Sequence, residues 1–165
     1  MKTKTILSIL FLFILLPALT TFAQKADFSG EWIMNKEKTV LADNQLFLSA
    51  ITIQHKSDSL LTNRTYTNGN GDEFPFDENL KLDGKECKIV IFEMPRTSKA
   101  AFSDTDGTIT IESTTTFNGN NGQEDMIANE AWNLDNEGQI LTLKFVNKMS
   151  GNEFTGTYYY NKVKK

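Results

Sequence analysis

The feature that most constrains this chain is a period of two in its hydrophobic pattern from Trp32 onward. Segments 50–56, 108–117 and 139–147 place Ile, Leu and Phe at alternate positions, with Thr, Gln, Glu and Lys between them. Alternate side chains of a strand point to opposite faces, so this period is typical of half-buried strands and not of helices. The pattern therefore predicts an all-β fold.

Clusters of Asn, Asp and Gly separate the alternating segments, for example at 68–71, 83–84 and 118–122. Asn-Gly and Asp-Gly pairs supply the positive φ that tight hairpins require. Short hairpins join successive strands in an antiparallel order. We predict strands at 28–34, 50–56, 59–67, 78–83, 86–93, 99–103, 108–117, 125–134, 139–147 and 154–162.

A meander of about eight to ten such strands removes its exposed edges by closing into an up-and-down barrel. The alternative is a two-sheet sandwich, which usually needs a longer crossing connection than this chain offers. One segment, 37–49, lacks the alternation, and we expect a short helix or an ordered loop there, after the first strand. The sequence thus predicts a single barrel domain over residues 24–165.

The N-terminus has the three parts of a secretory signal peptide. Lys2 and Lys4 precede an apolar run over 6–19, and small residues lead to Ala23. The run is shorter than the roughly 20 apolar residues of a transmembrane helix and contains Pro17. We therefore predict cleavage near Ala23 and Gln24, and a secreted or periplasmic protein that is not anchored in a membrane.

Composition excludes some partners. Without the two lysines of the leader, 15 basic residues face 21 acidic ones, a balance that disfavours nucleic acid and anionic lipid. Cys87 is the only cysteine, which excludes an internal disulfide, and one His with one Cys makes no familiar zinc site. We predict no metal, no cofactor and no catalytic residues, because no nucleophile and base stand at a recognisable spacing.

The stretch Phe28-Ser-Gly-Glu-Trp-Ile-Met-Asn-Lys-Glu-Lys38 resembles the opening of small secreted bacterial proteins of the lipocalin-like (calycin) class. Asp83-Gly-Lys85, the turn at 135–138 and the closing segment Tyr158–Val163 are similar to later parts of the same group. The resemblance implies a lipocalin-like barrel in which Gly30 allows close backbone contact and Trp32 plugs one end. It implies no particular activity.

The fatty-acid-binding branch of these barrels carries Arg-x-Tyr in its last strand, which clamps the ligand carboxylate. The matching positions here are Tyr158 and Tyr160, so the Tyr is kept and the Arg is absent. Arg64 and Arg96 are the only arginines after the leader, so a bidentate carboxylate clamp has few candidates.

Five residues are candidates for holding a ligand in the barrel. Each also has a purely structural interpretation. For the histidine it is a hydrogen-bonded residue of the core or the mouth, and for the carboxylate it is a position at the wet end of a strand or a pair with a lysine. For the tryptophan it is a place in the core, and for the two phenols it is hydrogen bonding to each other or to trapped water. These candidates are His55, Glu130, Trp132, Tyr158 and Tyr160.

Two functions remain open from the sequence. The first is a binding protein that carries a small apolar or amphipathic molecule in the barrel. The second is a structural or interaction protein of the cell envelope, with a filled barrel and a protein partner in place of a ligand. An enzyme is the third reading and has the least support, because a fold alone does not define an activity.

Overall fold

The computed structural model describes residues 26–39, 46–119 and 122–164. The predicted signal peptide lies outside the described residues, so its cleavage stays a prediction. Of the described residues, none forms a helix that is long and apolar enough to cross a membrane.

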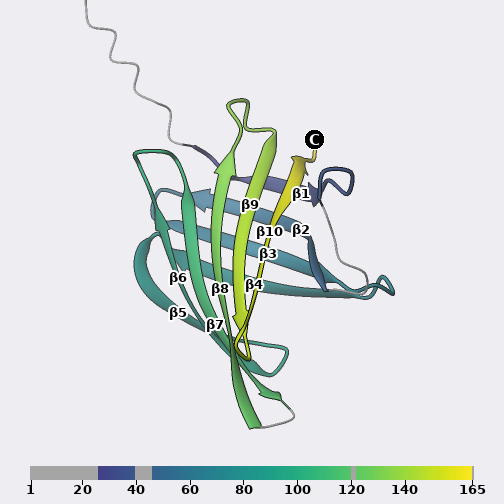
Figure 1. Ribbon diagram of the computed structural model, residues 1–165. Coiled ribbons are helices and arrows are strands. Elements are labelled where there is room, and N and C mark those ends of the chain that lie inside the picture. Colours follow the sequence, from purple (N-terminus) through teal and green to yellow (C-terminus); the bar gives the residue numbers. More distant parts are fainter. Residues whose placement is uncertain (1–25, 40–45, 120–121, 165) are drawn as a thin grey trace, which may run out of the picture.

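The described chain contains ten antiparallel strands in hairpin succession (Figure 1). Strong β-formers fill them, and the loops between them hold the Asn, Asp and Gly residues noted in the sequence. The strands are β1 (Gly30–Met34), β2 (Phe47–Lys56), β3 (Ser59–Thr67), β4 (Glu73–Lys81), β5 (Asp83–Ile91), β6 (Met94–Phe102), β7 (Ile109–Gly119), β8 (Gly122–Leu134), β9 (Ile140–Met149) and β10 (Asn152–Lys162).

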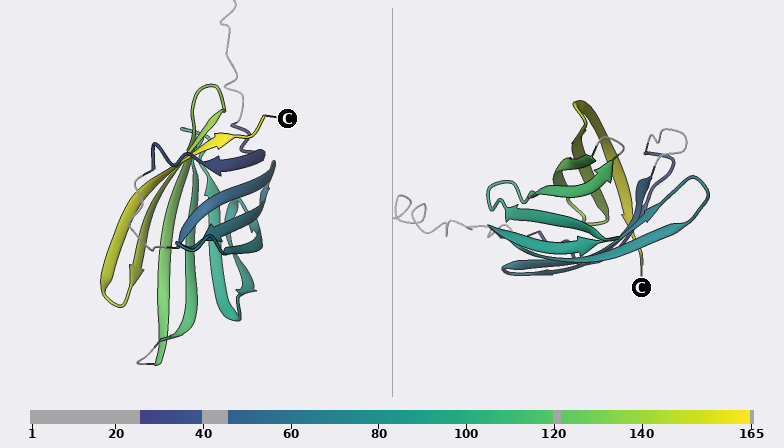
Figure 2. Two further views of the ribbon diagram at one scale, coloured as in Figure 1. Left: turned by 90° about the vertical axis from the view of Figure 1, so that its right-hand side faces the viewer. Right: turned by 90° about the horizontal axis from the view of Figure 1, so that it is seen from below.

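All ten strands belong to one sheet, in the order β4-β3-β2-β1-β10-β9-β8-β7-β6-β5. Because β1 pairs with β10, the meander curls back on itself, and β1–β4 cross behind the later strands (Figures 1 and 2). The result is a nearly closed barrel, which confirms the predicted fold class over a sandwich. The sheet order leaves β4 and β5 as its two edges.

One end of the barrel is closed by apolar side chains. Trp32 is 1% exposed there, and its indole N–H donates to the Phe28 carbonyl oxygen at 2.9 Å. Gly30 has a φ of +143°, and a Cβ at this position would lie 2.6 Å from Cε of Lys162, whose ammonium group lies over the Trp32 ring. Glycine at this position therefore lets β1 and Lys162 pack closely around the Trp32 plug.

Six strands begin earlier than the sequence predicted, and the two largest differences, of five residues, are in β4 and β6. β4 starts at Glu73 and β6 at Met94, and each contains a proline, Pro75 or Pro95, near its start. Proline lacks an N–H donor and usually marks a break in a strand. Both prolines are tolerated because each has a ladder partner on one side only: Pro75 lies on an edge strand, and Pro95 precedes the first residue that pairs with β7.

The segment after β1 is described in part. Residues 36–38 form a turn, and Phe47–Ser49 belong to β2, so the irregular segment expected at 37–49 is shorter than predicted. Residues 40–45 lie outside the described part.

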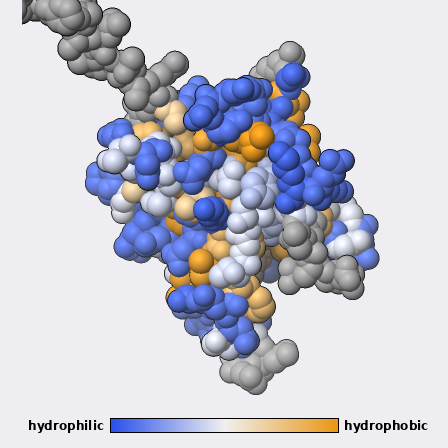
Figure 3. Space-filling model, turned by 45° about the horizontal axis from the view of Figure 1, so that its top comes forward, coloured by the Kyte–Doolittle hydropathy of each residue, from blue (hydrophilic) through white to orange (hydrophobic). Residues whose placement is uncertain are grey.

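The outer surface near the closed end is mostly polar, with scattered apolar patches (Figure 3). Outward positions of the strands carry Thr, Asn, Glu and Lys, as the alternation predicts.

Candidate functional site

Four charged side chains are buried inside the barrel, in the layer above the apolar plug. They come from β3, β4, β6 and β8, and alternate along their strands with other inward-facing residues. Two are positive and two are negative, and no other charged side chain of the described chain is buried. This inner charge cluster consists of Arg64, Glu78, Arg96 and Glu130.

Arg64 and Glu130 reach each other across the barrel from β3 and β8. One guanidinium nitrogen, Nη1, donates to both carboxylate oxygens, at 2.8 and 3.1 Å. Trp132 supports the pair twice: its indole N–H donates to Glu130 at 2.8 Å, and its ring lies 5.0 Å from the guanidinium carbon. Charge-assisted bonds and a ring contact therefore fix Glu130 in one orientation.

Glu78 joins the edge strand β4 to β6. It accepts hydrogen bonds from Nε of Arg96, at 3.1 Å, and from the Ser98 hydroxyl. Arg96 also donates to the Thr115 hydroxyl at 3.1 Å and lies 5.7 Å over the Phe76 ring. These hydrogen bonds link β4 to β6, beside the two edge strands of the sheet, β4 and β5.

Electrostatics keep Glu78 and Arg64 ionised. Burial alone would raise the pKa of Glu78, but the positive charges of Arg64 and Arg96 hold it below its ordinary value. Burial would lower the pKa of Arg64, and the carboxylates of Glu130 and Glu78 outweigh it and raise that pKa. The charges of Glu78 and Arg64 are therefore stabilised by opposite charges in the same interior.

The cluster does not use all of its hydrogen-bonding capacity. Nε and Nη2 of Arg64, Oε2 of Glu78 and the Ser113 hydroxyl are buried without a hydrogen-bond partner in the described chain. Nη2 of Arg64 lies 3.7 Å from Oε2 of Glu78, too far for a hydrogen bond. Unpaired buried polar atoms are rare in folded proteins and each carries a free-energy cost. The barrel therefore keeps a buried polar layer at a free-energy cost that an apolar core would not carry.

A small cavity of about 60 Å³ lies between the cluster and the open end of the barrel. Its polar lining comes from Arg96 and Glu130 and from the side chains of Tyr66, Asn147 and Tyr158. Its apolar lining comes from Leu46, Leu48, Met126, Ala128, Leu143 and Phe145.

Aromatic rings form part of the cavity wall. Tyr158 stacks on Phe145 with ring centroids 4.9 Å apart, and Tyr66 stacks on Phe76 at 6.0 Å. Burial raises the pKa of Tyr158 to about 12 and also raises that of Tyr66, so both phenols are uncharged at neutral pH. The cavity therefore offers neutral hydroxyls beside flat apolar surfaces.

Exposed apolar side chains gather toward the open end, where the β5–β6 hairpin carries Phe92 and Glu93 at φ values of 50° and 67°. Phe92 lies 6.1 Å from Phe74 and 6.2 Å from Phe76, ring to ring. A bulky residue at positive φ is uncommon, and strained backbone of this kind is often associated with function. The exposed apolar residues around this mouth are Leu46, Phe74, Phe92, Met149 and Phe154.

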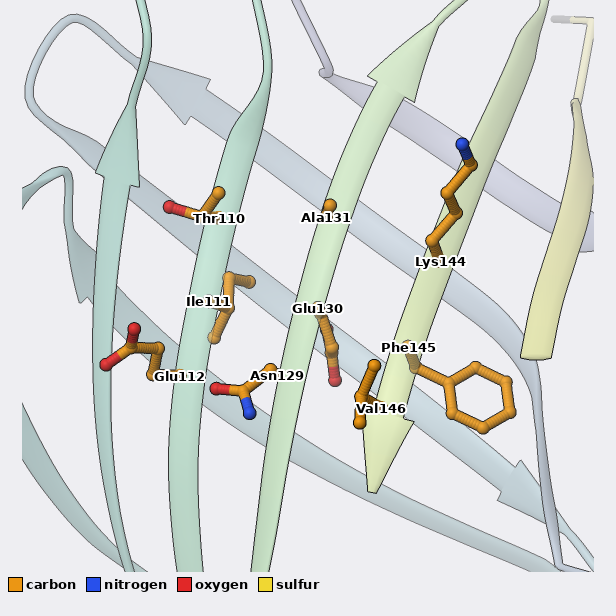
Figure 4. Close-up of a pocket in the computed structure, with 9 residues that line it drawn as sticks. All are labelled: Thr110, Ile111, Glu112, Asn129, Glu130, Ala131, Lys144, Phe145 and Val146. Carbon is orange, nitrogen blue, oxygen red and sulfur yellow. The ribbon is translucent and has the colours of Figure 1, made fainter. Parts of the chain in front are cut away.

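A larger depression of about 330 Å³ lies over β7, β8 and β9 (Figure 4). It centres on Ala131, whose small side chain lies between longer outward residues such as Glu112 and Lys144. This outer groove is shallow, and exposed side chains border it. We prefer the smaller interior cavity as the site because it combines enclosure with converging polar groups.

The five residues singled out from the sequence separate into groups. Glu130 and Tyr158 line the cavity, and Trp132 lies beneath it, against Arg64. The fully buried Tyr160 donates its hydroxyl to the Leu48 carbonyl oxygen at 2.9 Å. His55 lies apart, at the closed end, with its ring 5.8 Å from those of Phe28 and Phe102.

Sequence reasoning missed Glu78 as a site residue and treated Arg64 and Arg96 only as possible carboxylate clamps. Glu78 alternates with Phe76 and Leu80, and this alternation was a usable signal. Arg96 follows Pro95, which hid the start of its strand.

The described residues contain no group of three His, Cys, Asp or Glu side chains arranged to hold a metal ion. Comparisons with protein-family models, curated proteins and solved structures gave no match. The nearly closed, antiparallel up-and-down barrel is consistent with a lipocalin-like fold.

Proposed function

We propose that this protein binds a small amphipathic molecule inside the barrel, with its polar end toward the inner charge cluster and its apolar part in the mouth. The observation that carries the proposal is the cavity between these two surfaces, lined by Arg96 and Glu130 on one side and by Phe145 and Leu48 on the other. The predicted leader supports a carrier that acts after export. We propose no catalytic role.

The physical support is that the binding surfaces are already in place. The Arg64–Glu130 bonds and the Trp132 contacts hold the polar floor rigid, so a ligand would not have to order it. Apolar residues at the mouth are exposed, and covering them would release water from apolar surface. Together these features favour a molecule that is polar at one end only.

The size of the cavity supports a second candidate, a filled barrel with a structural or interaction role. Ligand sites commonly enclose about 300–1,000 Å³, and this cavity has about 60 Å³. The first candidate accounts for this difference if only the polar end of the ligand is enclosed and the rest lies in the open mouth. A protein partner on the mouth would account for the exposed apolar residues instead.

A neutral fluorescent probe, N-phenyl-1-naphthylamine, separates the candidates. We expect saturable fluorescence enhancement, which Ala128→Met abolishes because it fills the cavity. The matched control is Ala131→Met, which lies three residues along β8 on the outer face and should bind normally. No enhancement with the unmodified protein, or equal loss in both variants, would favour the filled barrel.

A further inference from the structure

We propose that the barrel selects a small, uncharged head group, such as a primary hydroxyl or amide, over a carboxylate or an ammonium group on the same chain. This inference rests on the proposed function and names the ligand class. It concerns the charge of the inner cluster and the size of the space above it.

The inner charge cluster is already neutral as a whole. Arg64 and Arg96 supply two positive charges, and Glu78 and Glu130 supply two negative ones. Their bonds are mutual: Glu130 is held by Arg64, and Glu78 is held by Arg96. No positive charge of the cluster is left without an opposite one to attract an anion.

A charged head group would upset this balance. An anion placed in the cavity would add a third negative charge to two, and a cation would add a third positive charge. An uncompensated charge in a low-dielectric interior is strongly unfavourable, because it gives up its hydration without gaining a matching partner. An uncharged group gives up less hydration and needs only hydrogen bonds.

The other titratable groups on the cavity wall do not supply the missing charge. Tyr66 and Tyr158 keep their protons at neutral pH, since burial raises the pKa of both phenols. Their hydroxyls and the Asn147 amide both donate and accept hydrogen bonds, and such groups suit a hydroxyl or an amide.

The cavity also limits the size of the head group. The cavity has about 60 Å³, far less than the roughly 300–1,000 Å³ of common ligand sites. A hydroxyl or a primary amide with the first carbons of its chain is of this size. The small space therefore favours a hydroxyl or a primary amide over a larger head group such as a sugar or a phosphate ester.

The test compares three ligands with the same alkyl chain at pH 7: decanol, decanoate and decylammonium, each below its micelle concentration. Each competes with N-phenyl-1-naphthylamine for the unmodified protein. We expect decanol to displace the probe at a concentration at least tenfold lower than either ion. This ranking needs only the natural sequence, so it does not depend on how well a variant folds.

Glu130→Gln then changes the cluster charge by one unit while it keeps the shape of the side chain. The cluster becomes net positive, and we expect the ratio of decanoate to decanol affinity to rise at least tenfold. Glu112→Gln is the matched control, because it removes one negative charge from the outer face of β7 and should leave the ratio unchanged.

The outcomes separate the two claims. Binding of decanoate or decylammonium as tightly as decanol would overturn the inference, and so would a folded Glu130→Gln variant with an unchanged ratio. Probe binding that none of the three ligands displaces would also overturn it. Failure of the probe itself to bind would overturn the proposed function instead.

Discussion

Arg64 and Glu130 are 66 residues apart in the chain, yet Nη1 of the arginine lies 2.8 Å from Oε1 of the glutamate inside the barrel. Arg64 is completely buried and Glu130 is 8% exposed. The contact spans the interior from β3 to β8, so it ties together strands that are far apart in the sheet. Removing either partner leaves a buried charge with less compensation, which makes this pair a sensitive test of the interior.

Glu130→Met should lower the free energy of unfolding by about 3–5 kcal/mol, the usual result of breaking a buried pair from one side. The double variant Arg64→Met/Glu130→Met should recover a large part of this loss, because Arg96 and Glu78 remain balanced. Urea unfolding measures all three proteins. A double variant less stable than the single one would contradict this account.

An exposed ion pair provides the control. Nζ of Lys81 lies 3.0 Å from Oδ2 of Asp58, a distance similar to that of the buried pair, but both side chains are largely exposed. Asp58→Asn should leave the urea midpoint almost unchanged, since solvent screens such pairs.

Trp32→Ala should lower the free energy of unfolding by about 3–5 kcal/mol, because the truncation removes a buried aromatic side chain and leaves a cavity at the closed end. Ile33→Ala is the neighbouring control, since Ile33 is 57% exposed. A loss below about 1 kcal/mol for Trp32→Ala, the range of surface changes, would mean that Trp32 is not the plug.

Acid should destabilise the protein through Glu78. Its pKa in the folded protein lies below the ordinary value of 4.5, because Arg64 and Arg96 outweigh the effect of burial. The unfolded chain therefore takes up the proton first, and stability falls as the pH drops from about 4.5 through the lower folded value.

Urea unfolding at a series of pH values measures this effect. Glu78→Gln should flatten the acid limb of the stability curve, whereas the outward-facing neighbour variant Asp77→Asn should keep it. Equal acid limbs for Glu78→Gln and the unmodified protein would show that another group controls the loss.

Glu93→Gly should raise the free energy of unfolding by about 1 kcal/mol, because a two-residue hairpin with both φ values positive favours glycine. Glu112→Gly makes the same change in the extended backbone of β7 and should destabilise the protein by about 0.5–1 kcal/mol. If Glu93→Gly also destabilises the protein, the turn is not strained.

Much of the barrel could be predicted from the sequence because its local signals agree. Alternation and Asn-Gly or Asp-Gly turns place β3 and β8 within a few residues of their observed bounds. The same alternation puts Glu130 on the inner face with Ala128 and Trp132. These are properties of single strands, so they need no knowledge of the partner strands.

The inner charge cluster could not be assembled in the same way, because it depends on which strands face each other across the closed barrel. Arg64 and Glu130 belong to strands that are not paired in the sheet. Glu78 and Arg96 each follow a proline that obscured the start of the strand. His55 lies away from the cavity because it stands near the opposite end of β2 from the lining residue Leu48.

Amide NMR during a titration with decanol tests the central claim most directly, because it reports which face of β8 the ligand contacts. We predict saturable shifts at cavity positions such as Tyr66, Ala128 and Tyr158, with Thr110 and Glu112 in the outer groove unaffected. Shifts confined to the outer groove, or none at any concentration, would contradict an interior binding site.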